Sequence, residues 1–145
     1  MCAHRSGKIL NLSSLANDCG INHNTAKAWI SILETSFIVF LLPPHHKNFN
    51  KRMIKSPKLY FYDTGLVSYL IGVKNEHELV NHSNVGAVFE TYVISEMVKM
   101  RMNRGLPFNL YFWRDKLGRE IDCIIEDGDA LTPVEIKAGR TITSH

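Results

Sequence analysis

The sequence predicts an α+β fold of two modules, and three observations point to it. Two short amphipathic helices separated by a glycine turn come first, and a hydrophobic strand with a basic stretch follows them. A long helix then precedes three strand-like segments, the last two of which are joined by an Asp-Gly turn. This order of elements predicts a first module over residues 1–73 and a second over residues 74–145.

The composition is that of a folded, soluble protein. Of the 145 residues, 45% are hydrophobic and 21% are charged. No apolar run approaches the roughly 18 residues that a membrane span needs, and the first ten residues lack a signal-peptide pattern. The three cysteines (Cys2, Cys19 and Cys123) form no CxxC pair, which argues against a disulfide framework or a zinc knuckle. We therefore expect a cytoplasmic protein that does not enter a membrane.

The first two helices have the spacing of a helix-turn-helix. The pattern predicts a helix over Leu12–Asp18, a turn at Gly20, and a second helix from His23 or Asn24 to Thr35. Apolar residues of the second helix follow the i, i+3, i+4, i+7 rule at Ala26, Trp29, Ile30 and Leu33. In such a motif the N-terminal end of the second helix enters the major groove of DNA. The side chains there that can bond bases or phosphates are Asn22, Asn24, Thr25 and Lys27.

A hairpin with a basic loop is predicted next. Residues 37–42 form a β-branched and aromatic strand that Pro43-Pro44 ends, and residues 58–62 form the returning strand. The basic side chains of the loop between them are Lys47, Lys51, Arg52, Lys55 and Lys58, with no acid among them. A helix-turn-helix followed by a hairpin makes a winged helix, and the basic wing suits a DNA phosphate backbone. Two alternatives stay open: the loop is merely solvated, or the winged helix binds another protein.

After the hairpin, the sequence pattern becomes mainly helical. A short helix is expected over Leu66–Ile71, and the polar residues 74–83 are taken as the module boundary. The clearest helix covers Asn84–Met102, with Glu90 at the edge of its apolar stripe. The stripe is predicted to comprise Val85, Val88, Phe89, Tyr92, Val93 and Met100.

Three strands complete the pattern, over residues 108–114, 120–126 and 132–137. With the last turn centred on Asp127-Gly128, residue 122 would face residue 133, and residue 120 would face residue 135. Alternation then places Asp122, Glu135 and Lys137 on one sheet face. The opposite, apolar face would carry Ile121, Cys123, Ile125, Val134 and Ile136.

The charged face has the residue types of a metal-dependent phosphodiesterase. Asp122 and Glu135, as diagonal neighbours about 7–8 Å apart at the backbone, can converge on one Mg²⁺ or Mn²⁺. The cation would polarise a phosphoryl oxygen, and the Lys137 ammonium would hold the attacking water or stabilise charge on the phosphate. Glu90 would add a third carboxylate. The alternative is an exposed sheet face with charged residues.

Glu120 falls on the same face as an additional acid. It needs a partner, for which the candidates are Arg114, Arg119 and Lys137.

These motifs, in this order, resemble a known family. The residues that carry the resemblance are Thr25 to Glu34, Asn50-Lys51-Arg52, Lys55 to Leu66, Gly86 to Glu90, Phe112 to Asp115, Glu120-Ile121-Asp122, and Val134 to Gly139. Over about residues 10–142 the chain is similar to the C-terminal domain of unknown function of bacterial and archaeal AAA-superfamily ATPases. That domain in turn resembles the PD-(D/E)XK restriction-endonuclease superfamily.

The resemblance implies a winged helix followed by a restriction-endonuclease-like mixed α/β core. It implies that the nuclease positions are Glu90, Asp122, Glu135 and Lys137. It also implies an ATPase module upstream, although the chain has no GxxxxGK[ST] motif. Around Gly7-Lys8, Cys2 stands where the first glycine should be, and Ile9 stands where the motif needs Ser or Thr.

The core is expected to be C-terminally truncated, because the chain ends eight residues past Lys137. The helix and strand that usually complete such a core would then be missing. Truncation would leave an exposed sheet edge that favours self-association.

Three functions are therefore carried forward. The first is a DNA-associated fragment of an AAA-type ATPase with a nuclease-like metal site that hydrolyses phosphodiesters. The second is a non-catalytic DNA- or protein-binding regulatory module whose nuclease site is a relic. The third is an interaction domain that couples an ATPase to a partner.

Overall fold

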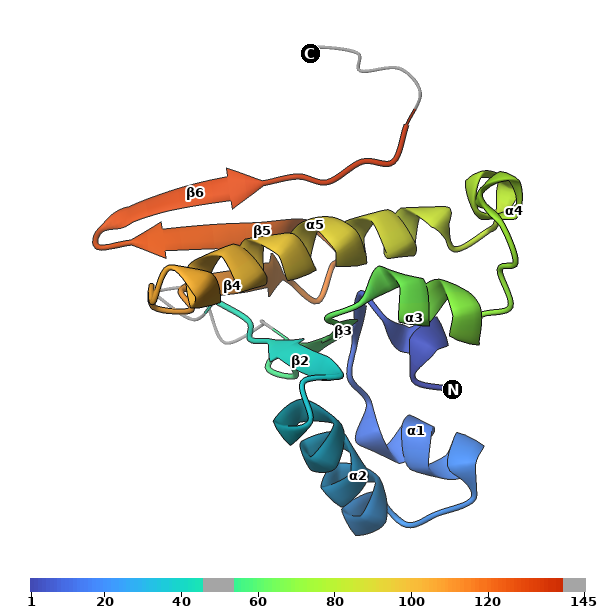
Figure 1. Cartoon of the computed structure of the whole chain (residues 1–145). Helices are drawn as coiled ribbons and strands as arrows, with labels where there is room; N and C mark the ends of the chain where they lie inside the picture. Colours follow the sequence, from blue (N-terminus) through green and yellow to red (C-terminus); the bar gives the residue numbers. More distant parts are fainter. Residues whose placement is uncertain (46–53, 140–145) are drawn as a thin grey trace.

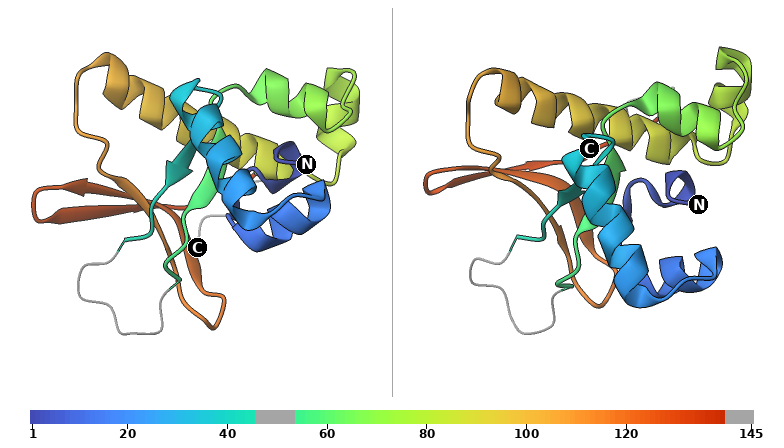
Figure 2. Two further views of the ribbon diagram at one scale, coloured as in Figure 1. Left: turned by 90° about the horizontal axis from the view of Figure 1, so that it is seen from below. Right: turned by 60° about the horizontal axis from the view of Figure 1, so that its bottom comes forward.

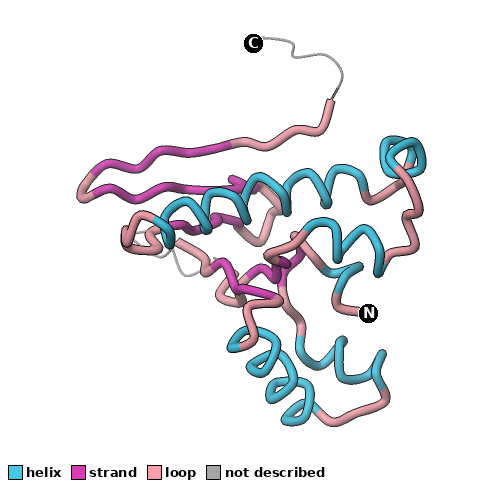
Figure 3. Tube along the Cα trace, viewed as in Figure 1, coloured by secondary structure: helices cyan, strands magenta, loops and turns pink. Residues whose placement is uncertain are grey.

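The computed structural model describes residues 1–45 and 54–139 of the chain (Figure 1). The helices are the 3-10 helix η1 (Ala3–Arg5), α1 (Leu12–Cys19), α2 (His23–Thr35), α3 (Thr64–Leu70), α4 (Glu76–Asn81) and α5 (Val85–Asn103). The strands are β1 (Lys8–Ile9), β2 (Val39–Leu42), β3 (Lys58–Phe61), β4 (Leu110–Arg114), β5 (Glu120–Asp127) and β6 (Ala130–Val134). These helices and two antiparallel sheets confirm the predicted α+β class (Figure 3).

The N-terminal half is built around the sheet β1-β3-β2, in which β3 is the central strand. Helices α1 and α2 lie where the sequence predicts them. The side chain of Asn11 caps the first and that of Asn22 caps the second. Gly20 ends α1 with φ 66°, a left-handed conformation that glycine adopts without the penalty of a Cβ.

A first hydrophobic core joins these helices to the sheet. Its buried residues are Ala3, Leu10, Leu15, Ile30, Val39, Leu59, Phe61, Val67 and Val88. The contribution of Val88 from α5 ties the long helix to the N-terminal half.

The second sheet has the order β4-β5-β6, and α5 packs against one of its faces (Figures 1 and 2). A second core fills the space between them: Phe40, Leu42, Tyr60, Ile94, Val98, Leu110, Phe112 and Cys123. The first three of these residues belong to the N-terminal half, so this core is shared between the two sheets. Backbone hydrogen bonds join the sheets as well, since the His45 amide donates to the Phe112 carbonyl at 2.8 Å.

The buried face of α5 differs from the predicted stripe. Phe89, Tyr92 and Met100 are exposed, and the buried side chains are Val88, Thr91, Ile94, Ser95, Val98 and Arg101. The helix itself carries apolar residues on several of its sides, so their periodicity does not select one buried face. Small hydroxyl residues decide it: Thr91 bonds Ser6 at 2.8 Å and lets the N-terminal segment approach closely.

The register of the last hairpin is also corrected. Cys123 faces Val134 and Asp127 faces Ala130, a shift of two residues from the predicted pairing. The turn is formed by residues 128–129 because Gly128, with φ 62°, takes the first of the two turn positions. The shift is even, so Ile125 and Val134 still pack on the second core as predicted.

The strand predicted over residues 132–137 ends at Val134, so Glu135 and Lys137 lie beyond β6. Strand β5 contains an irregularity that the sequence analysis does not include. The pairing steps from Tyr111–Ile124 to Trp113–Ile121, which leaves one extra residue on β5 near Asp122. Such a bulge interrupts the alternation of side chains and re-aims those beside it.

Smaller differences occur at element ends. The strand predicted from Phe37 begins at Val39, because Phe37 has φ 55° in the turn after α2. Of the predicted apolar residues of α2, Ala26 and Ile30 are buried and Leu33 is half-buried, whereas Trp29 is exposed. The polar stretch 74–83 contains helix α4, and the module boundary placed there stays a prediction.

Within residues 1–45 and 54–139, no helix has the length and hydrophobicity needed to cross a membrane.

Candidate functional site

The most densely charged interior site of the described chain is a cluster of five side chains from β3, α5, β4 and β5: Lys58, Tyr60, Glu90, Arg114 and Glu120. We call it the Lys58 cluster. The Lys58 ammonium lies 3.2 Å from a Glu90 carboxylate oxygen and also forms an ion pair with Glu120. The Tyr60 hydroxyl donates to the same Glu90 oxygen at 2.5 Å. Arg114 approaches the other oxygen of Glu120 at 3.3 Å.

Burial makes these contacts energetically important. The Lys58 side chain is 2% exposed, and the side chains of Glu90 and Glu120 are 19% and 25% exposed. Burial alone would lower the pKa of Lys58, but the two carboxylates outweigh it and raise the pKa. Burial and the Glu90 charge likewise raise the pKa of Tyr60. Lys58 therefore stays protonated as the internal counter-ion of two acids from different elements.

Asp122 lies beside this cluster at the bulge of β5, and its charge also contributes to the raised pKa of Tyr60. One Asp122 carboxylate oxygen accepts a hydrogen bond from the Ile136 amide at 2.8 Å. This bond holds the segment after β6 against β5. Two of the four predicted catalytic residues, Glu90 and Asp122, are thus near Tyr60.

The other two predicted catalytic residues are at the surface. The side chains of Glu135 and Lys137 are 58% and 81% exposed, and their charged atoms are 3.8 Å apart. Among the described residues, no group of three or more His, Cys, Asp or Glu side chains is arranged to hold a metal ion. The Glu90 carboxylate accepts hydrogen bonds from the Lys58 ammonium and the Tyr60 phenol, and the predicted metal ligands Asp122 and Glu135 stay a prediction.

The sequence analysis places Lys58 on the wing, whereas the structure places it inside the molecule. The partner that Glu120 requires is Lys58 together with Arg114, which was one of the candidates; Arg119 instead pairs with Asp115. Tyr60 is missed altogether. A signal exists in the strand pattern, because a lysine in the otherwise apolar run Lys58–Tyr62 must be paired if the strand is central.

The predicted DNA-contacting residues of α2 are largely accessible. Asn24 and Lys27 are exposed, and Thr25 is half-buried. The side-chain oxygen of Asn22 accepts from the Thr25 amide at 2.8 Å, so Asn22 serves as a helix cap. Of the wing residues, Lys55 is exposed, whereas Lys47, Lys51 and Arg52 lie outside the described residues.

Comparison with known proteins gives two family matches. A model described as "Domain of unknown function (DUF8612)" matches residues 1–77, just over half of the chain. The chain belongs to this DUF8612 family. A second model, "Domain of unknown function (DUF4143)", matches residues 85–145.

Two relatives of this DUF8612 chain are the uncharacterized proteins Mb2031c of Mycobacterium bovis and Rv2008c of Mycobacterium tuberculosis. Each is 30% identical over 141 residues, which is 97% of this chain and 31% of the relative. The chain thus spans about a third of the length of these relatives. No solved structure matches it significantly.

Proposed function

We propose that this chain is a DNA-binding module of a larger, ATPase-containing protein, in which a winged helix contacts DNA and the nuclease-like half has a structural role. The connectivity of the N-terminal half carries this proposal. Strand β1, helices α1 and α2, and the hairpin β2–β3 follow one another, and the three strands pair in the order β1-β3-β2. This order of elements supports a helix-turn-helix with a wing.

The distribution of accessible cations supports a DNA interface on α2 and the hairpin. Lys27 and Lys55 are exposed on these elements, and the predicted wing adds further basic residues to the sequence between β2 and β3. Cations at the surface contact phosphates and release counter-ions from DNA. The length of the relatives is consistent with additional domains, among which we place the ATPase.

The Lys58 cluster supports a non-catalytic role for the nuclease-like half. An ammonium stands between Glu90 and Glu120, where a hydrolytic site would need a divalent cation near carboxylates. Lys58 supplies the positive charge permanently and cannot act as a Lewis acid. On this proposal, Glu90 is retained for the ion pairs that join α5 to β3.

Metal-dependent phosphodiester hydrolysis is the second candidate. The observation that favours it is the position of Glu90 and Asp122, both of which act on the Tyr60 hydroxyl from different elements. Asp122 and Glu135 remain the proposed ligands for Mg²⁺ or Mn²⁺.

Salt-dependent binding to duplex DNA tests the first candidate. Fluorescence anisotropy should show an association constant that falls about tenfold or more between about 50 and about 200 mM salt. The double variant Lys51→Glu, Lys55→Glu should bind more weakly on every DNA sequence. Lys116→Glu, an exposed lysine in the β4–β5 connection, is the matched control and should bind nearly as the wild type. Binding that is unchanged in the double variant would refute the basic-wing contact.

Calorimetric titration with MgCl₂ or MnCl₂ separates the two candidates. The proposed structural role predicts no saturable binding to the wild type or to Asp122→Asn. Saturable binding that disappears in both Asp122→Asn and Glu135→Gln would favour the hydrolytic candidate instead.

A further inference from the structure

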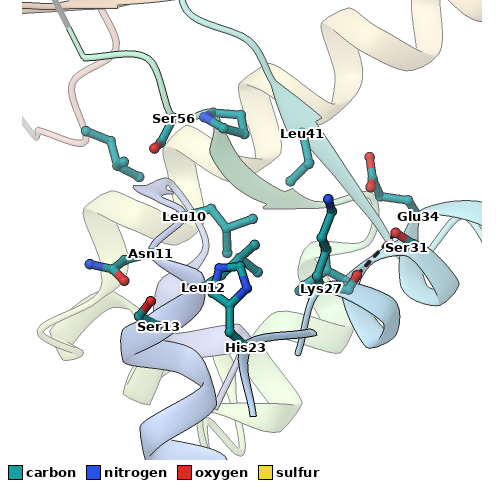
Figure 4. A pocket seen from close by; sticks show the side chains of 13 residues that line it. Leu10, Asn11, Leu12, Ser13, His23, Lys27, Ser31, Glu34, Leu41 and Ser56 are labelled. Atoms are coloured by element: carbon teal, nitrogen blue, oxygen red, sulfur yellow. Dashed lines mark hydrogen bonds between the residues drawn. The ribbon is translucent and has the colours of Figure 1, made fainter. Parts of the chain in front are cut away.

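An open groove of about 490 Å³ lies between α2 and the base of the β-hairpin (Figure 4). The polar side chains that line it are Asn11, Ser13, His23, Lys27, Ser31, Glu34 and Ser56. Leu10, Ile30 and Leu41 contribute the apolar part of its wall. The groove is thus formed by the segment from β1 into α1, by α2, by β2 and by the residues that precede β3.

The groove has a polarity along α2. His23, Lys27, Ser31 and Glu34 follow one another at spacings of three or four residues, which places them on one helix face. The basic residues are nearest the N-terminus of the helix, and Glu34 lies about 10 Å further along the axis from Lys27. The electrostatic potential is therefore most positive at the end formed by His23 and Lys27.

Lys27 is available for a ligand. Its side chain is exposed, and it forms no ion pair with any residue of the described ranges. The Ser31 hydroxyl donates to the Lys27 carbonyl at 3.2 Å, which leaves the ammonium unaffected. In Figure 4 the Lys27 side chain extends along the groove beside Leu41.

We propose that this groove holds one phosphodiester strand of duplex DNA, with a phosphate at the Lys27 ammonium. This inference rests on the proposed function and specifies which surface meets the DNA backbone. Ser13 and Ser56, on the opposite sides of the groove, donate hydroxyl hydrogen bonds to phosphate or sugar oxygens. Glu34 ends the site, because its carboxylate repels the next phosphate.

The openness of the groove favours a continuous strand over a free nucleotide. The groove is open to solvent, and its rim continues to the exposed Lys55, next to the lining residue Ser56. A backbone that lies in the groove therefore reaches the wing side of the hairpin and the N-terminal end of α2 at the same time. Most polar contacts in protein–DNA complexes are of this backbone kind.

Two charge changes of opposite sign test the proposal by anisotropy with a 16-base-pair duplex. Lys27→Gln should weaken binding about three- to tenfold and reduce the slope of log K against log salt by about 1, on all sequences alike. Glu34→Gln should strengthen binding about two- to threefold. Lys74→Gln, an exposed lysine between α3 and α4, should leave both quantities unchanged and is the matched control.

A parallel NMR titration with inorganic phosphate tests the phosphate site directly. Chemical-shift changes confined to the amides of residues 13, 27, 31 and 56, and lost in Lys27→Gln, would support a phosphate site at Lys27. A wild type that fails to bind duplex DNA would overturn both the proposed function and the DNA strand as the occupant of the groove. DNA binding with normal salt dependence in Lys27→Gln would overturn the groove and leave the proposed function standing. Loss of binding in Glu34→Gln would contradict the predicted polarity.

Discussion

Lys58 and Lys27 are both predicted to bind DNA, yet the structure gives them opposite surroundings. Lys58 is on the central strand β3, 2% exposed, between Glu90 and Glu120. Lys27 is on the open face of α2 and forms no ion pair with any described residue, although Glu34 lines the same groove further along the helix. Formal charge is the same in both, so burial and pairing determine which lysine is free to meet a phosphate.

The difference in burial also gives the two lysines different roles, Lys58 in the stability of the fold and Lys27 in ligand binding. A buried ammonium with two carboxylates is costly to disrupt, because removing one partner leaves the others without compensation. An exposed lysine contributes little to the folded state and keeps its charge for a ligand. The substitutions and the pH change below test this contrast, in order of decreasing expected loss of stability.

Lys58→Met should give the largest loss of stability. Glu90 and Glu120 would lose their shared cation, and we expect the free energy of unfolding to fall by about 3–5 kcal/mol. Urea denaturation followed by circular dichroism measures this loss. Lys27→Met is the matched control and should change the value by less than about 0.5 kcal/mol. Equal effects of the two substitutions would show that the contrast is wrong.

Alkaline pH should destabilise the same region. Burial raises the pKa of Cys123 to about 11, and the pKa values of Lys58 and Tyr60 are also raised. In each case the folded state holds its proton more tightly than the unfolded chain, so this stabilisation is complete below the unfolded pKa and is lost as pH rises.

Cys123 alone should contribute a loss of about 3 kcal/mol between pH 9 and pH 11. Urea denaturation at pH 8 and at pH 11 measures the combined effect, and Cys123→Ala should show a smaller drop between these two pH values. A wild-type stability that is constant up to pH 11 would refute the assignment.

Gly20→Ala should cause an intermediate loss of stability, in the helical half that also contains the groove. The residue has φ 66° at the end of α1, where a Cβ costs about 1–2 kcal/mol. Thermal unfolding should therefore show a lower midpoint than the wild type. Gly86→Ala in helix α5 is the control: a Cβ there meets nothing within 4 Å, and the change should be neutral or stabilising by up to about 1 kcal/mol. A midpoint that Gly20→Ala does not lower would argue against the left-handed turn.

Glu135→Gln should have the smallest effect on stability. Its carboxylate contacts only the exposed Lys137 ammonium among the described side chains, at 3.8 Å. We expect a change in the free energy of unfolding of less than about 0.5 kcal/mol by urea denaturation. A loss above about 2 kcal/mol would mean that Glu135 belongs to an interior network.

Local features of the chain were predictable from the sequence, whereas choices between faces were not. Gly20 and the apolar spacing of Ala26 and Ile30 locate α1 and α2, and the sequence around Asp127-Gly128 locates the last hairpin. The two-residue register shift depends on which turn position Gly128 takes, and short-range patterns leave this open. The buried face of α5 depends on what packs against it, so Phe89 was misassigned.

The candidate site was predictable in part for the same reason. Glu90 and Asp122 were identified from their order along the chain, and both lie near Tyr60. Lys58 was assigned to the wing because its position in sequence follows a run of basic residues. Lys58 is buried because β3 pairs with β1 on one side and with β2 on the other. The residues next to Lys58 in the sequence do not reveal this central position.

The shared second core has a mechanical consequence for the hairpin β2–β3. In the connection between β2 and β3, the His45 amide donates to the Phe112 carbonyl at 2.8 Å. The Ile54 amide donates to the Arg114 carbonyl at 3.4 Å. A pull on the hairpin is therefore borne by β4, and through β4 by α5 and the second sheet. Removing everything after about residue 74 would abolish that anchorage and leave Phe40, Leu42 and Tyr60 facing water. The two halves should consequently resist force, and yield to it, together.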